Sequence, residues 1–190
     1  MFSPHSTDAV CGNPSPGFPQ VRAVHLQASP ALAARGVSLR WLGEDDHAWL
    51  RDLYASTREH EFAQLDWDGG MRRAFLDQQF DLQHRHYLTH FAEADFLAVC
   101  GAGRPLGRLY LCRTAPMHLL VDICLFSAAR NEGIGRQLID AAQCGAAAQG
   151  CGIRLHVATA NAGARRLYER LGFIAAGVEA AHLRMEWQSG

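Results

Sequence analysis

Apolar and polar residues alternate from Val37 to Trp41, and this two-residue period predicts a strand with one buried face. The run from Leu119 to Leu125 is almost entirely apolar, with Asp122 as its single interruption. Such a run predicts a strand buried in the middle of a sheet. Apolar residues at helical spacing, which begin with Trp49 and Leu53, predict helices between the strands.

The two-residue and helical periods also predict the secondary structure of the rest of the chain. They predict strands over residues 37–41, 95–100, 106–113, 119–125, 153–158, 174–176 and 183–187. They predict helices after an acidic start at 43–46, over about 71–91, from about 133 to 149, and over 162–171. A loop is expected over 60–70 and a longer hairpin turn over 101–105. This order of elements predicts an α/β fold built on a mixed sheet.

The first 36 residues show neither period. Five of the seven prolines lie within the first thirty residues, and Gly, Ser and Ala fill much of the remainder. This composition predicts an irregular leader over 1–36 that could be disordered. The folded domain is expected over residues 37–190, a length that fits one domain with a sizeable core.

Composition narrows the class of protein. Hydrophobic residues make up 48% of the chain, and 18 basic residues against 19 acidic ones give a net charge of -1. This balance favours neither nucleic acid nor an anionic membrane as a partner. No apolar run reaches the roughly 18 residues of a membrane span. The first residues lack the features of a secretory signal, so a cytoplasmic location is expected.

The six cysteines lie at irregular spacings without any C-x-x-C pair. This spacing indicates neither a zinc site nor a thioredoxin-type redox site. Most of the cysteines are therefore expected to be small buried side chains in a reducing compartment.

The candidate chemistry lies where the buried strand 119–125 runs into the next helix. Arg130, Gly133 and Gly135 form an R-x-x-G-x-G pattern across the start of that helix. Free N–H groups and the helix dipole favour negative charge there, and glycines let the backbone approach a phosphate closely. A pyrophosphate ligand is expected. A dinucleotide fingerprint would need a third glycine where Leu138 stands, and the loop has no P-loop lysine.

These residues resemble the GNAT superfamily of acyl-CoA-dependent N-acyltransferases. Its acetyl-CoA motif, Q/R-x-x-G-x-G/A, matches at Arg130, Gly133 and Gly135. The segment from Asn161 to Phe173 is similar to the family's N-x-x-A-x-x-L-Y-x-x-x-G-F pattern. The resemblance implies a central mixed sheet of six to seven strands flanked by helices. It also implies that two neighbouring strands splay apart to admit acetyl-CoA.

The resemblance further implies which residues hold the acyl donor. The strand 122–125 would part from 156–158 and leave a V-shaped gap for the pantetheine arm. The cofactor-binding residues would be Ile123, Leu125, Arg130, Gly133, Ile134, Gly135, Arg136 and Asn161. Asn161 could instead act only as a helix cap. No metal is expected. The other substrate would be the amine of a small molecule or peptide, and the chain could be a monomer or a homodimer.

Direct attack by an amine requires proton transfers. A free alkylamine has a pKa of about 10.4, so deprotonating it at neutral pH costs roughly 4.6 kcal/mol. Tyr168 matches the family tyrosine that acts as general acid toward the departing thiolate. Asp122 is the candidate base, because a lone carboxylate in an apolar strand is costly without a task. It could instead bind the acceptor amine or pair with Arg108.

Three further groups of residues leave their role open. Acidic residues surround Trp67 and could face a cationic acceptor or simply be solvated; they are Glu59, Glu61, Asp66 and Asp68. His84, His86 and His90 lie close together, but no H-E-x-x-H pattern supports a metal site. His156 could relay protons or be a histidine of the core.

The sequence thus predicts an N-acetyltransferase that moves the acetyl group of acetyl-CoA to a primary amine in a ternary complex. The alternative is a module of the same fold that binds acyl-CoA for sensing or assembly without catalysis. The tyrosine at position 168 favours the enzyme.

Overall fold

The computed structural model describes residues 17–22, 26–62 and 67–190. Its centre is one open sheet with the strand order β1-β2-β3-β4-β5-β7-β6. The strands are β1 (Val37–Trp41), β2 (Ala94–Gly101), β3 (Arg104–Cys112), β4 (Met117–Leu125), β5 (Gly152–Ala158), β6 (Ile174–Glu179) and β7 (His182–Trp187). Only β4 and β5 are parallel neighbours. The predicted mixed α/β sheet is confirmed.

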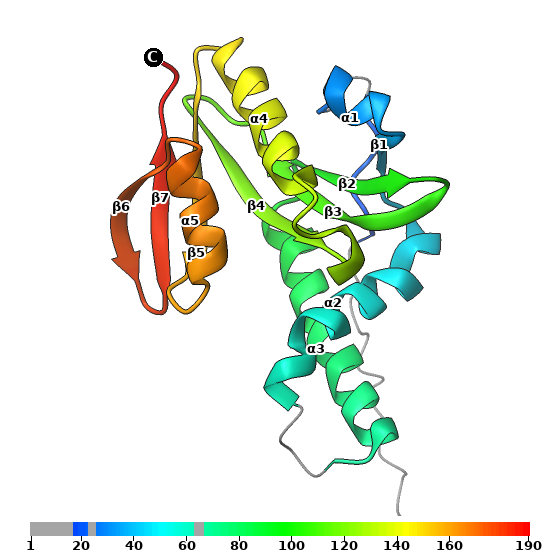
Figure 1. The fold of residues 1–190 in the computed structure, drawn as a ribbon. Coiled ribbons are helices and arrows are strands. Elements are labelled where there is room, and N and C mark those ends of the chain that lie inside the picture. The colour runs from blue at the N-terminus through cyan, green and yellow to red at the C-terminus, as the bar shows by residue number, and fades with distance from the viewer. Residues whose placement is uncertain (1–16, 23–25, 63–66) are drawn as a thin grey trace, which may run out of the picture.

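Helices cover both faces of the sheet (Figure 1). They are α1 (Pro30–Ala34), α2 (His47–Phe62), α3 (Gly69–His90), α4 (Ile134–Ala147) and α5 (Ala162–Arg170). One core lies between the sheet and α4 with α5, and includes Leu138, Leu155 and Tyr168. A second core lies between the sheet and α2 with α3, and includes Leu50 and Phe80. Among the described residues, no helix is long and apolar enough to cross a membrane.

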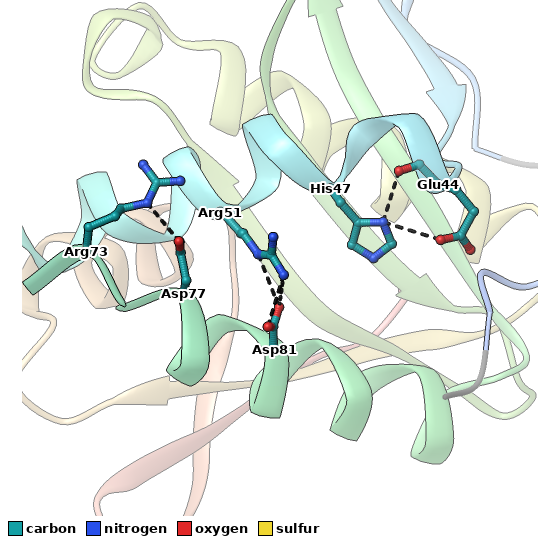
Figure 2. Close-up of polar contacts among 6 residues, drawn as sticks. All are labelled: Glu44, His47, Arg51, Arg73, Asp77 and Asp81. Atoms are coloured by element: carbon teal, nitrogen blue, oxygen red, sulfur yellow. Dashed lines mark hydrogen bonds and ion pairs between the residues drawn. The ribbon is translucent and has the colours of Figure 1, made fainter. Parts of the chain in front are cut away.

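The helices α2 and α3 pack side by side and carry several polar contacts. Arg51 of α2 donates to both carboxylate oxygens of Asp81 on α3, at 2.8 and 3.0 Å (Figure 2). Within α3, Arg73 pairs with Asp77 at 2.9 Å. These side chains are partly exposed, and such pairs contribute about 1 kcal/mol or less each. Buried apolar residues therefore hold the two helices together.

The predicted loop over 60–70 is shorter than expected. Helix α2 continues to Phe62, and α3 begins at Gly69 after Asp68, whose carboxylate accepts from the Met71 N–H at 2.8 Å. The longer hairpin turn expected at 101–105 is also wrong. Ala102 and Gly103 alone connect β2 to β3, both with positive φ, which is the geometry of a tight hairpin turn.

Part of the expected leader belongs to the folded body. Ser29 caps α1 and Pro30 occupies its first turn. Leu26 is 7% exposed and Leu32 is fully buried, and both join the core beneath α4. Residues 1–16 and 23–25 lie outside the described part, so the boundary of the domain near residue 37 stays a prediction. At 30–34 the structure has the helix α1 where an irregular leader was expected.

His84 makes the packing of α3 sensitive to acid. This residue is 5% exposed, its ring stacks on Phe80 at 5.2 Å, and neither ring nitrogen has a hydrogen-bond partner among the described residues. Burial, assisted by the nearby charges of His47, Arg108 and Arg51, lowers the pKa of His84 to about 4. The neutral imidazole is therefore the form that the fold accepts.

We expect this histidine to destabilise the protein as the pH falls. The unfolded imidazole has a pKa of about 6.5, so its contribution is intact above that value and declines toward pH 4, by about 3 kcal/mol in all. Denaturant unfolding between pH 4 and 7 measures this loss. His84→Leu should flatten the decline, whereas His90→Leu at an exposed position should not. If the free energy of unfolding declines equally in the wild type and both variants, His84 is not the group that causes the decline.

Candidate active site

The sheet opens between β4 and β5. The two strands pair from Met117 to Leu120, opposite Gly152 to Leu155, and no pair follows although both strands continue. The break coincides with a bulge, because Tyr110 of β3 lies opposite Asp122 while the next residue lies opposite Leu120. A bulge bends its strand and raises the local twist. The predicted V-shaped gap between 122–125 and 156–158 is therefore present.

The bulge also decides which way Asp122 faces. Leu120 and Ile123 both pack into the core beneath α4, although side chains three positions apart on a regular strand face opposite sides. The bulge adds one residue to the strand, so two consecutive side chains face the same side. Val121 packs into the other core, and Asp122 turns toward α3. Without the bulge, the carboxylate would point into the apolar core beneath α4.

The free edge of β4 presents backbone groups to this gap. The Phe126 N–H donates to the Leu106 carbonyl on β3, and a Cβ on Gly107 would lie 2.1 Å from the Cys124 carbonyl oxygen. Positions 124 and 126 therefore direct their backbone groups toward β3. By the alternation of a strand, Ile123 and Leu125 direct theirs toward the gap. The Leu125 carbonyl there accepts from Arg130 Nε at 2.8 Å.

Helix α4 begins at the mouth of the gap. Gly133 is its N-cap with φ +80, and the first intrahelical bond runs from the Gln137 N–H to the Gly133 carbonyl. The N–H groups of Ile134, Gly135 and Arg136 thus lie at the positive end of the helix dipole. The Ile134 side chain is buried in the core, so this residue offers only its backbone to a ligand.

The segment before the domain supports this loop. Arg35, next to α1, donates to the Glu132 carbonyl at 2.8 Å and pairs with its carboxylate at 3.4 Å. The expected leader therefore ends in a contact with the candidate phosphate loop. Arg136 is well exposed and lies 3.6 Å from Asp140, one turn along α4. Its guanidinium is accessible from solvent.

Tyr168 of α5 lies in the core beneath α4, while Asp122 lies on the other side of the sheet. The Tyr168 ring is 7% exposed and packs against Phe173 at 5.7 Å. Burial, with a contribution from the negative charge of Asp122, raises the pKa of Tyr168 to about 12. The phenol therefore keeps its proton at neutral pH. Asn161 caps α5, since its side-chain oxygen accepts from the Ala164 N–H at 3.1 Å, and it also lines the cleft.

Asp122 is not the lone carboxylate that the sequence indicated. Its Oδ2 accepts from Arg108 Nε at 2.6 Å, and Arg108 Nη2 donates to Gln83 on α3 at 2.9 Å. Burial works against the charge of this arginine, which is 4% exposed, but the neighbouring carboxylate outweighs it and raises the pKa of Arg108. The pairing with Arg108, one alternative drawn from the sequence, is present.

A cleft of about 1100 Å³ extends from the gap toward α2 and α3. One wall carries aromatic and basic side chains of the two helices, among them Tyr54, Arg58 and Tyr87. The other wall carries His156 of β5 with Glu179 and His182 of the β6–β7 hairpin. Glu179 could not be singled out from the sequence, because its position beside β5 follows from the hairpin and not from any local pattern.

The acidic residues expected near Trp67 contribute little that can be described. Asp66 lies outside the described residues, as do the side chains of Glu59 and Glu61, and Asp68 serves as the cap of α3. Trp67 packs between Phe62 and Phe75. A role for these carboxylates in acceptor binding stays a prediction.

The three histidines of α3 lie in two separate places. His84 lies in the aromatic cluster beneath α2, while His86 and His90 stack on each other at 4.1 Å. Within residues 17–22, 26–62 and 67–190, no three His, Cys, Asp or Glu side chains are placed to hold a metal ion. The described cysteines are free thiols, and Cys124 lines the cleft.

The fold is similar to that of solved acetyltransferases. A PaiA N-acetyltransferase from Thermoplasma acidophilum, in complex with coenzyme A, is 17% identical with a TM-score of 0.61, and the match covers 80% of this chain and 98% of that one. A spermidine N-acetyltransferase from Vibrio cholerae, in complex with CoA and spermine, is 20% identical with a TM-score of 0.56, over 81% and 96%.

A GNAT-family acetyltransferase from Staphylococcus aureus Mu50 is 17% identical with a TM-score of 0.57, over 81% of this chain and 99% of that one. At these identities the likeness concerns the fold. The family model of the acetyltransferase (GNAT) family matches residues 47–173. The chain therefore belongs to the GNAT acetyltransferase family. No sequence among the curated proteins matches it.

Proposed function

We propose that this chain is an N-acetyltransferase that moves the acetyl group of acetyl-CoA to a primary amine by direct attack in a ternary complex. The observation that carries the proposal is the parting of β4 from β5 after Leu120, next to the N-terminus of α4. The parting leaves the open edge of β4 next to an anion site at the start of α4. A long ligand that carries a pyrophosphate needs both features side by side.

The acyl donor would lie along the open edge of β4. The backbone groups of Ile123 and Leu125 would pair with the amides of the pantetheine arm, in the way a strand edge pairs with a peptide. The pyrophosphate would lie at the loop of Arg130 and Gly133, against the N–H groups of Ile134, Gly135 and Arg136. Two similar structures are described as complexes with coenzyme A, which supports this donor.

The acceptor amine would enter from the cleft of α2 and α3. Asp122 would hold its ammonium group near the thioester, and the amine nitrogen would then attack the carbonyl carbon. Tyr168 would donate its proton to the sulfur as the carbon–sulfur bond breaks. The acceptor would be the amine of a small molecule or peptide; a similar structure is named as a spermidine N-acetyltransferase.

Two glycines, one at the start of α4 and one inside it, give matched tests of donor binding. Gly133→Ala should cost about 1–2 kcal/mol of stability, because its φ of +80 is strained for a residue with a Cβ, and should weaken acetyl-CoA binding. Gly145→Ala, inside α4 and away from its N-terminus, should bind acetyl-CoA normally, because the added Cβ meets Leu26 at 4.0 Å, an ordinary contact. Titration calorimetry measures both. Equal affinities for the two variants would argue against a phosphate at Gly133.

The reaction itself is tested by offering a panel of acceptors. The purified chain is incubated with saturating acetyl-CoA and polyamines, amino acids, aminoglycosides or basic peptides, and mass spectrometry detects the gain of an acetyl group. A product that depends on Tyr168 would support the enzyme. Tight acetyl-CoA binding without turnover on any acceptor would favour the sensing or assembly module instead.

A further inference from the structure

The cleft contains a second pair of titratable groups that the family motif does not include. His156 follows Leu155, the last residue of β5 that pairs with β4. Leu155 and Val157 face the core beneath α4, so the alternation of the strand turns His156 to the opposite side. There it lines the cleft with 37% of its side chain exposed. It is not a core histidine, and it stands at the rim of the V-shaped gap.

The carboxylate of Glu179 lies beside one nitrogen of this imidazole. Its Oε2 lies 3.5 Å from His156 Nε2, and its other oxygen lies 3.2 Å from Arg184. The β6–β7 hairpin holds the carboxylate, since Glu179 pairs with His182 at the end of the two strands. A carboxylate beside one ring nitrogen favours the proton on that nitrogen. Nδ1 of His156 is then left as a proton acceptor.

Asp122 is less suited to accept a proton, because it neutralises Arg108. The guanidinium is 4% exposed, and protonating its carboxylate partner would leave a buried cation without a counter-charge. The same carboxylate can still attract the ammonium group of an acceptor. The two acidic side chains of the cleft would thus have different tasks: Asp122 holds charge, and Glu179 orients a base.

We propose that His156, oriented by Glu179, is the general base of the acetyl transfer, an inference that rests on the proposed N-acetyltransferase function. Nδ1 of His156 takes one proton from the acceptor ammonium, and the freed electron pair forms the carbon–nitrogen bond. As the carbon–sulfur bond breaks, the nitrogen loses its second proton to solvent and the sulfur takes the Tyr168 proton. His156 and Tyr168 then return to their starting states by proton exchange with solvent.

The test compares His156→Ala with His90→Ala, a matched change at an exposed histidine of α3 that does not line the cleft. We expect His156→Ala to lower kcat by about 10²- to 10⁴-fold, with acetyl-CoA affinity unchanged. Added imidazole should restore part of the rate. The wild-type rate should rise with pH to a plateau, and this limb of the pH profile should be absent from the variant.

Glu179→Gln should lower kcat less than His156→Ala and should shift the pH limb without removing it. A His156→Ala enzyme with wild-type kcat and pH profile would overturn the proposal while leaving the N-acetyltransferase in place. So would a limb that disappears in Asp122→Asn and persists in His156→Ala, because the base would then be Asp122. A wild-type chain that acetylates no amine would overturn the proposed function together with this inference.

Discussion

Replacing Tyr168 by phenylalanine should slow acetyl transfer by about 10²-fold or more and leave the fold intact. The ring would keep its contact with Phe173, so only the hydroxyl group is lost. Burial first, and the charge of Asp122 second, raise the pKa of Tyr168 to about 12, so the hydroxyl keeps its proton at neutral pH and suits the proposed role of proton donor. Without it, the thiolate would have to leave unprotonated or wait for water.

Steady-state kinetics at saturating acetyl-CoA measure this effect as a fall in kcat. The thermal midpoint and the acetyl-CoA affinity serve as controls and should stay close to those of the wild type. CoA release should be followed by chromatography, because the exposed thiol of Cys144 would react with a thiol reagent. Wild-type kcat in Tyr168→Phe would remove this tyrosine from the mechanism.

The ion pair of Arg108 and Asp122 should have the largest effect on stability. Asp122→Ala would leave a guanidinium that is 4% exposed without its partner, which costs about 3–5 kcal/mol in buried pairs. The lower end is expected because the Asp122 side chain is 20% exposed. Replacing both residues, as Arg108→Met with Asp122→Leu, should recover most of this stability, because neither charge then remains.

Denaturant unfolding distinguishes these outcomes. Arg73→Ala is a suitable control, because the ion pairs of Arg73 with Asp77 and Asp52 are partly exposed to solvent, and the loss of each should cost about 1 kcal/mol or less. The double variant should be folded and inactive, since it lacks the carboxylate that we propose holds the ammonium group of the acceptor. If Asp122→Ala lowers the free energy of unfolding no more than the control does, Arg108 and Asp122 do not behave as a buried ion pair.

Much of the fold could be predicted from local patterns. The alternation at Val37–Trp41 and the apolar run at 119–125 became β1 and β4, and the helical periods became α2 to α5. The hairpin turn was missed because Ala102 adopts a positive φ that alanine seldom takes. The packing of Leu26 and Leu32 was missed because two buried leucines in a proline-rich stretch form no period.

The part of the candidate site that a single segment forms was predictable from the sequence. The parts where several segments meet were not. The pattern at Arg130, Gly133 and Gly135 lies on a single turn, and its place at the start of α4 is as expected. The bulge beside Asp122 leaves no trace in the sequence, and neither does the approach of Glu179 to His156 across the β6–β7 hairpin. Such contacts depend on strand pairing between distant residues.

Calorimetric titration of the purified chain with acetyl-CoA tests most directly whether the opening between β4 and β5 is a donor site. We expect saturable binding of acetyl-CoA that coenzyme A displaces and NAD does not, and that weakens in Gly133→Ala. Such a result would place the donor where the open strand edge and the start of α4 meet. A folded chain that binds neither acetyl-CoA nor coenzyme A at millimolar concentration would contradict the N-acetyltransferase and the sensing module alike.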